Sequence, residues 1–153
     1  MKNLNVLALL LVFVMFACQS DEYEKKILST YPDKSPQVVQ YYEWVGNRQE
    51  VRKEVRFFRN GQEKVVGHFK DGQKHGSWTE WYPNGEKWTE FTYEQGRRHG
   101  PFTVWFMSGK VNYSGGYKDG LPHGKWIYYD GRGNKQKQVR YDAGKKVDEK
   151  IIE

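Results

Sequence analysis

The residues with the clearest chemical potential are three histidines that recur every 24 residues. His75, His99 and His123 share one phase, and imidazole nitrogens are common zinc ligands. Zinc binds these nitrogens at ~2.0–2.1 Å, whereas repeat units of two strands would place successive histidines ~10 Å apart. One ion could not bridge them, so we predict no metal site. We expect a structural role instead, with each His–Gly pair at a turn.

Other catalytic constellations are absent from the sequence. It contains no Gly-x-Ser-x-Gly motif, and its one cysteine, Cys18, lies close to the N-terminus. Glu80 and Glu90 could act as paired carboxylates, but acids at repeated positions are more often solvated partners of Lys and Arg. The glycines around Arg132 belong to a turn and do not open a phosphate-binding helix. We therefore expect a protein that is not an enzyme and needs no cofactor.

The composition indicates a folded, polar, single domain. The chain has 153 residues, of which 29% are charged and 16% are aromatic. Disordered chains are poor in aromatic residues, so disorder does not explain this composition. The formal net charge is +6, yet acids and bases are interleaved and no basic run occurs. Binding of nucleic acid is therefore not expected.

The 24-residue period extends from the histidines to glycines and aromatic residues. Self-similarity at a fixed period indicates a repeat array, in which each unit stacks on its neighbours to bury its apolar face. The series are Gly61, Gly85, Gly109 and Gly133; Gly72, Gly96, Gly120 and Gly144; Phe69, Tyr93, Tyr117 and Tyr141; and Phe57, Trp81, Trp105 and Tyr129. Together they define about four units.

The pattern inside one unit predicts a β-hairpin. Trp78–Tyr82 has strand-forming residues, Pro83–Glu86 contains Asn-Gly, and residues 87–93 read as the return strand. Because Asn and Gly both tolerate positive φ, we expect primed turns at Asn-Gly, while Gly72 and its repeats turn the chain into the next unit. The predicted fold is all-β, an elongated antiparallel meander of β-hairpin repeats.

Alternation along the strands predicts two columns of aromatic side chains on opposite faces of the sheet. The columns are Trp78, Phe102 and Trp126 on one face and Trp81, Trp105 and Tyr129 on the other. A flat sheet would leave one column in water. We therefore expect twist or curling that shelters one column and leaves the other partly exposed.

The N-terminus has the features of a secretory signal. An apolar stretch at residues 4–17 is shorter than the roughly 20 residues of a membrane-spanning helix. It ends in Met15-Phe16-Ala17-Cys18, which resembles the lipobox of bacterial lipoproteins and implies lipidation of Cys18. The alternative is an ordinary signal peptide with an incidental cysteine. We predict a signal peptide at 1–17, a lipidated N-terminus and flexible tether at 18–37, and the repeat domain at 38–153.

The residues after the cysteine bear on which membrane holds the protein. Gln19 stands where an aspartate would retain a lipoprotein in the inner membrane, so the sorting rules imply the outer membrane. Ser20–Glu22 resembles an acidic signal that sends some Bacteroidetes lipoproteins to the cell surface. We expect a lipid-anchored protein of the bacterial cell envelope. Its exposure on the periplasmic or the outer face stays open.

The best copy of the unit, HGSWTEWYPNGEKWTEFTYEQG, resembles the bacterial variant of the MORN repeat, which is often labelled a YwqK-type antitoxin. The resemblance covers residues 52–146. It implies β-hairpin repeats with a binding or scaffolding role. An exported lipoprotein would not share a compartment with a cytoplasmic toxin, so the label is a family name more than a mechanism.

Two surfaces are candidate partner-binding sites. One is an aromatic stripe, because exposed aromatic stripes bind sugars, peptides or proteins; the alternative is that these rings form the core. The other is a basic edge at the turns between repeats, although interleaved acids favour a merely solvated edge. The candidate residues are Trp81, Tyr82, Trp105, Phe106 and Tyr129 on the stripe, and Lys74, Arg97 and Arg98 on the edge.

These features predict a non-catalytic envelope lipoprotein that binds a protein partner or serves as a scaffold. Two alternatives remain open. The same aromatic residues could recognise an envelope polysaccharide, or the protein could be an immunity-type antitoxin that captures a toxin in the envelope. The sequence does not identify the partner.

The lipoprotein interpretation predicts the effect of removing the cysteine. Cys18→Ala should release the protein from membranes, because the lipid chains on Cys18 are the expected anchor. Fractionation of cells that express either form measures this directly. Unchanged membrane association of the variant would contradict the interpretation.

Overall fold

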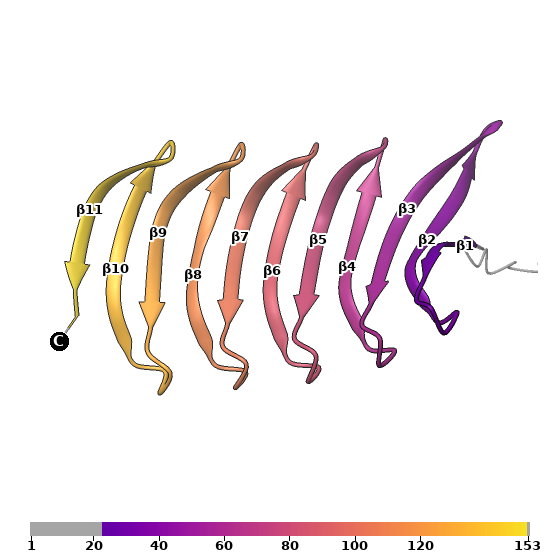
Figure 1. Cartoon of the computed structure of the whole chain (residues 1–153). Helices are drawn as coiled ribbons and strands as arrows, with labels where there is room; N and C mark the ends of the chain where they lie inside the picture. The colour runs from indigo at the N-terminus through magenta and orange to yellow at the C-terminus, as the bar shows by residue number, and fades with distance from the viewer. Residues whose placement is uncertain (1–22, 153) are drawn as a thin grey trace, which may run out of the picture.

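The computed structural model describes residues 23–152, and in this part of the chain eleven strands form one open antiparallel sheet (Figure 1). Strands that are neighbours in sequence are neighbours in the sheet. The predicted all-β meander of hairpins is thereby confirmed. The strands are β1 Glu24–Thr30, β2 Pro36–Val45, β3 Arg48–Phe57, β4 Glu63–Lys70, β5 Gln73–Trp81, β6 Lys87–Glu94, β7 Arg97–Trp105, β8 Val111–Lys118, β9 Leu121–Tyr129, β10 Lys135–Asp142 and β11 Lys145–Ile151.

The predicted signal peptide and the lipidated Cys18 lie outside the described residues. Among residues 23–152, none of the chain forms a helix with the length and apolarity needed to cross a bilayer.

The flexible tether predicted for residues 18–37 is wrong from Glu24 onward. β1 lies within it, and the ladder between β1 and β2 pairs Glu24 with Tyr42 and Ile27 with Val39. Ile27 and Leu28 both stay exposed on this edge strand. The segment therefore lacks the alternation of apolar and polar residues by which a half-buried strand is identified in a sequence.

Two kinds of turn alternate along the array. Asp71–Gly72 and its three repeats have positive φ at both residues, which is the type I′ turn of a two-residue hairpin. At Asn84–Gly85 only the glycine has positive φ, and its N–H donates to the Tyr82 carbonyl in a three-residue loop. The prediction of primed turns at Asn-Gly is therefore wrong. Asn84 instead uses its side-chain amide to donate to the Met107 carbonyl of the next unit.

The His–Gly pairs lie inside strands and not at turns, contrary to our expectation. Their glycines have positive φ within β5, β7 and β9, for example 69° at Gly76. Next to Gly76, the ladder with β4 slips from the Gly67–Trp78 pair to the His68–His75 pair, so the insertion is a β-bulge. Bulges bend strands, and Figure 1 shows strands that bow along their length.

The aromatic core cluster lies on one face of the sheet, whereas the buried pair Val39 and Val55 lies on the other, because Val55 adjoins Glu54, which pairs with Gly67. Trp78, Phe102 and Trp126 are only 4%, 6% and 5% exposed, so the predicted sheltered column is confirmed. Phe91 stacks on Phe102 with ring centroids 4.9 Å apart, and Val139 pairs with Trp126. Edge-on rings of the return strands lie 5.3–5.8 Å from Trp78 or Trp126; they belong to Phe69, Tyr93, Tyr117 and Tyr141.

Two glycines make room for the tryptophans of this core. A Cβ atom on Gly67 would lie 2.1 Å from the Trp78 ring, and one on Gly115 would lie 2.3 Å from the Trp126 ring. Both distances are far below van der Waals contact. The backbone of the return strand therefore serves as the surface on which each indole rests.

Substitution at Gly67 tests this packing. Gly67→Ala should lower the free energy of unfolding by about 1–3 kcal/mol or more, because the added methyl group overlaps the Trp78 ring. Chemical denaturation measures the change. Gly131→Ala is the matched control, since Gly131 has ordinary φ and a Cβ there meets nothing within 4 Å. Equal stability of the two variants would contradict the proposed role of Gly67.

Alkaline pH should destabilise the fold through Tyr128. Burial, assisted by the nearby Tyr141 hydroxyl, raises the pKa of Tyr128 to about 12. Because the pKa in the unfolded chain is about 10, the contribution of this group is complete below pH 10 and is lost between pH 10 and about 12. Urea unfolding across this range should show a smaller decline in Tyr128→Phe than in the wild type. An identical decline would show that other groups cause it.

Candidate binding surfaces

The second aromatic column forms a row on the face opposite the core. Trp81, Trp105 and Tyr129 end β5, β7 and β9, each three positions after a buried core ring, so they point to the other side of the sheet. All three are half-buried and lie outside the buried core cluster. The predicted partial exposure of this column is confirmed. We call these residues the aromatic row.

A lysine that the sequence analysis did not single out joins the aromatic row. The ladder between β5 and β6 slips just before Trp81, so Trp81 pairs with Lys87. The Lys87 Nζ atom lies 5.5 Å from the centroid of the Trp105 ring and 3.0 Å from Oε2 of Glu90. Regular alternation along β6 would place the Lys87 side chain on the same face as the core residues Thr89 and Phe91. The extra residue at the bulge, Trp88, reverses this and places Lys87 on the face of the aromatic row. The aromatic row thus lies next to an ion pair, Lys87–Glu90.

Tyr82 and Phe106 follow the first two rings of the row and are both half-buried. The Tyr82 hydroxyl donates to the Trp105 carbonyl at 2.9 Å, and its ring lies 6.0 Å from Trp88. Tyr82 therefore links two successive repeats. Phe106 has the same place in the next unit but no hydroxyl group to make this bond.

Two of the three basic candidates cover the core. Lys74 Nζ lies 4.0 Å from the centroid of the Trp78 ring, and Arg98 Cζ lies 4.4 Å from that of Phe91. Such cation–π contacts contribute roughly 0.5–2 kcal/mol each. Because their head groups already contact core rings, Lys74 and Arg98 are less available to a partner than the exposed Arg97.

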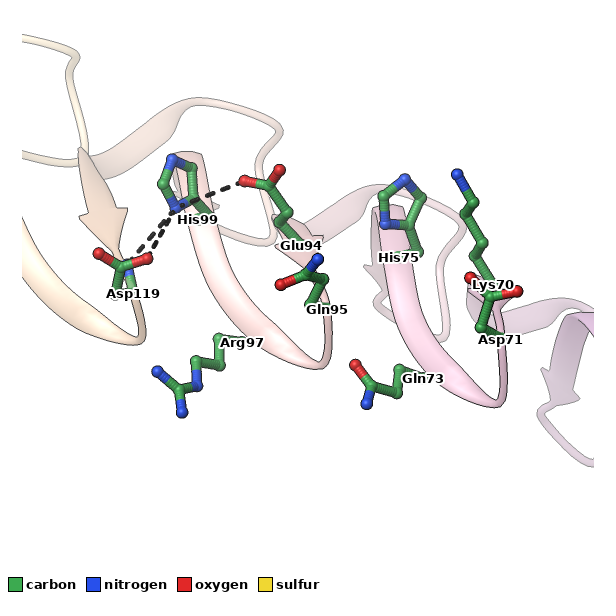
Figure 2. A pocket seen from close by; sticks show the side chains of 9 residues that line it. All are labelled: Lys70, Asp71, Gln73, His75, Glu94, Gln95, Arg97, His99 and Asp119. Atoms are coloured by element: carbon green, nitrogen blue, oxygen red, sulfur yellow. Dashed lines mark hydrogen bonds and ion pairs between the residues drawn. The ribbon is translucent and has the colours of Figure 1, made fainter.

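Arg97 and two of the histidines line a shallow polar depression of about 700 Å³ along the edge made by the two-residue turns (Figure 2). His99 Nδ1 lies 3.7 Å from a Glu94 carboxylate oxygen and 3.5 Å from one of Asp119, while His75 stands one unit away. The lining residues are Lys70, Asp71, Gln73, His75, Glu94, Gln95, Arg97, His99 and Asp119. The negative charges of the acidic residues in this depression offset the positive charges of its Lys and Arg residues. In residues 23–152, no group of three or more His, Cys, Asp and Glu residues is placed to hold a metal ion.

The comparisons with known proteins leave the family open. No family model matches the chain, and no curated protein matches it. Among solved structures, TarM has a TM-score of 0.31 at 16% identity over 82% of this chain and 20% of that chain. A point mutant of S. aureus TarM, in complex with fondaparinux, alpha-GlcNAc-glycerol and UDP, has a TM-score of 0.28 at 15% identity over 85% of this chain and 20% of that chain. The chain thus spans about a fifth of these proteins, and a likeness this low carries no functional argument.

Because the core rings are buried and the aromatic row is partly exposed, we expect truncation of a core ring to lower the free energy of unfolding more than truncation of a ring in the row. Trp126→Ala should lower the free energy of unfolding by about 3–5 kcal/mol, because it empties a buried site. Trp105→Ala should cost less, roughly 2 kcal/mol, because its ring is only partly buried and its removal leaves no enclosed cavity. Urea denaturation of both variants measures the difference. If Trp105→Ala proves as costly as Trp126→Ala, the aromatic row belongs to the core.

Proposed function

We propose that this protein is a non-catalytic lipoprotein of the bacterial cell envelope whose MORN-like hairpin array binds a protein partner. The aromatic row is the contact surface. The observation that supports this proposal most directly is the partial exposure of Trp81, Trp105 and Tyr129 along three successive repeats, on the face opposite the aromatic core cluster.

The chemistry of the row suits protein recognition. Tryptophan and tyrosine dominate the energetic centres of protein interfaces, where rigid rings bury much area at low entropic cost. Trp81 and Tyr129 lie on strands four spacings apart, so the row extends over about 20 Å. That length fits a standard interface, which buries about 800 Å² on each partner. The charged pair Lys87–Glu90 beside Trp105 would supply orientation.

A second candidate ligand is an envelope polysaccharide. The rings recur on every second strand, at ~10 Å, and hydroxyl and charged side chains stand between them. Sugar rings stack their C–H faces on aromatic rings and hydrogen-bond through their hydroxyl groups. Ser77 and Lys87 both contact Glu90 on this face, which gives a polar cluster of the required kind.

Affinity capture tests the proposal. The mature protein is immobilised and exposed to detergent-solubilised envelope, alongside a Trp81→Ala/Trp105→Ala double variant. Trp44→Ala is the matched control, because Trp44 is 63% exposed and lies in β2, away from the aromatic row. We expect a protein that binds the wild type and the control, with binding to the double variant weakened at least about 30-fold, as for loss of 2 kcal/mol or more at an interface centre.

The captured protein is then purified and titrated against each form. Equal binding to the double variant would show that the row is not the contact surface. Capture of no protein, together with a change in tryptophan fluorescence on addition of envelope glycans that the double variant lacks, would favour the polysaccharide candidate.

A further inference from the structure

The N-terminal end of the array exposes large apolar side chains that the aromatic row does not include. Trp44 is 63% exposed, whereas Trp88 is 44% exposed and the other four tryptophans are half-buried or buried. Val45, beside Trp44, is 38% exposed, and Tyr23 is 44% exposed. Trp44 is thus the most exposed tryptophan of the protein, and large apolar side chains exposed in this way are candidates for a contact surface.

Trp44 and Val45 lie at the tip of the β2–β3 hairpin. Gly46, with φ of 60°, begins the turn, and Arg48 follows it with 82% of its side chain exposed. Trp44 and Val45 are consecutive strand residues, so the tip presents the ring on one face and the aliphatic side chain, paired with Arg48, on the other. Figure 1 shows this hairpin at the end of the array where the chain enters the sheet.

The register of β1 places the incoming chain next to this tip. Glu24, the first residue of β1, pairs with Tyr42, only three residues before Val45. Three strand residues span about 10 Å. The five residue steps from Cys18 to Tyr23 can span at most about 17 Å when fully extended. A lipid anchor at Cys18 therefore brings the tip within reach of the same membrane surface.

We infer that the β2–β3 tip inserts into the headgroup region of the membrane beside the lipid anchor, with Trp44 and Val45 as the inserted side chains and Arg48 facing lipid phosphates. This inference rests on the proposed anchoring of the protein through Cys18. Tryptophan favours the membrane–water interface because its ring is apolar while its N–H group can still bond to water or lipid. The anchor holds the protein at the membrane, and the tip fixes its orientation.

The charges around the tip are compatible with a phosphate-rich surface. Glu43 is bound by Arg52 at 2.6 Å, and Arg52 also lies 3.3 Å from Glu50. Glu24 lies 3.5 Å from Lys26. The acids near the tip are thus paired with bases of the same sheet, whereas Arg48 has, among residues 23–152, a single ion-pair partner, Glu50 at 3.7 Å.

The small size of the tip favours a membrane over a protein partner. A stable protein interface buries about 800 Å² on each side, and two residues at the end of a hairpin cannot supply that area. A membrane-bound protein needs no such area, because the lipid chains provide the affinity and each inserted side chain adds to it.

The experiment uses the full chain, produced in a bacterial host, purified from its membranes and reconstituted into phosphatidylethanolamine–phosphatidylglycerol vesicles. Flotation first measures whether the protein stays with the vesicles. Tryptophan fluorescence is then compared in vesicles with and without lipids brominated close to the headgroup. The variants are Trp44→Tyr and, as a matched exposed tryptophan distant from the tip, Trp88→Tyr.

We expect bromolipids to quench the wild type and Trp88→Tyr equally, and we expect this quenching to be lost in Trp44→Tyr. Undiminished quenching in Trp44→Tyr, or none in a wild type that floats, would overturn the inference and leave the anchor intact. A wild type that does not float would overturn both the anchor and the inference. Circular dichroism confirms that the exposed substitutions leave the fold unchanged.

Discussion

The packing of indole rings against glycine backbone is the contact on which this structure depends. A single-layered sheet has no second layer to cover its apolar face, so the core must form from side chains of the sheet itself. Trp78 and Trp126 achieve this by lying flat over Gly67 and Gly115, where any Cβ would collide with them. The 24-residue period repeats a large aromatic ring at this position, Trp78, Phe102 and Trp126, with the rings that enclose it, so each added hairpin extends the same core.

This arrangement assigns different tasks to the two faces. The core face is covered by its own aromatic rings and by cations such as Lys74 and Arg98. The other face carries the partly exposed aromatic row. Its rings are aligned because each one ends an odd-numbered strand, β5, β7 or β9. A ligand of the aromatic row would bind along a surface, and the number of repeats sets the length of that surface.

The period alone predicts the meander, the two columns and the order of the strands, because each follows from spacing in the sequence. It does not predict the register. Asn-Gly is compatible with both a primed turn and a three-residue loop, and the backbone pairing across Asn84–Gly85 decides between them. The bulge that moves Lys87 into the aromatic row is equally invisible, since it depends on ladder hydrogen bonds with β5. The strand β1 also could not be predicted from side-chain spacing, because an exposed edge strand needs only backbone pairing to be ordered.

The two ends of the array differ because only one of them continues the core. Beyond Gly67, the core-face position in β3 is filled by Glu54, which is 6% exposed and accepts hydrogen bonds from Gln40 and Arg56. A buried carboxylate must be satisfied in this way, so the aromatic stack ends here and the first hairpins are free to carry Trp44 outward. At the opposite end, β11 carries exposed lysines and a bulge, the devices by which edge strands avoid pairing with other chains. Of the two ends, only the N-terminal one carries an exposed tryptophan, so the array has a direction. If the β2–β3 tip faces the membrane, the aromatic row lies on repeats that the membrane does not cover.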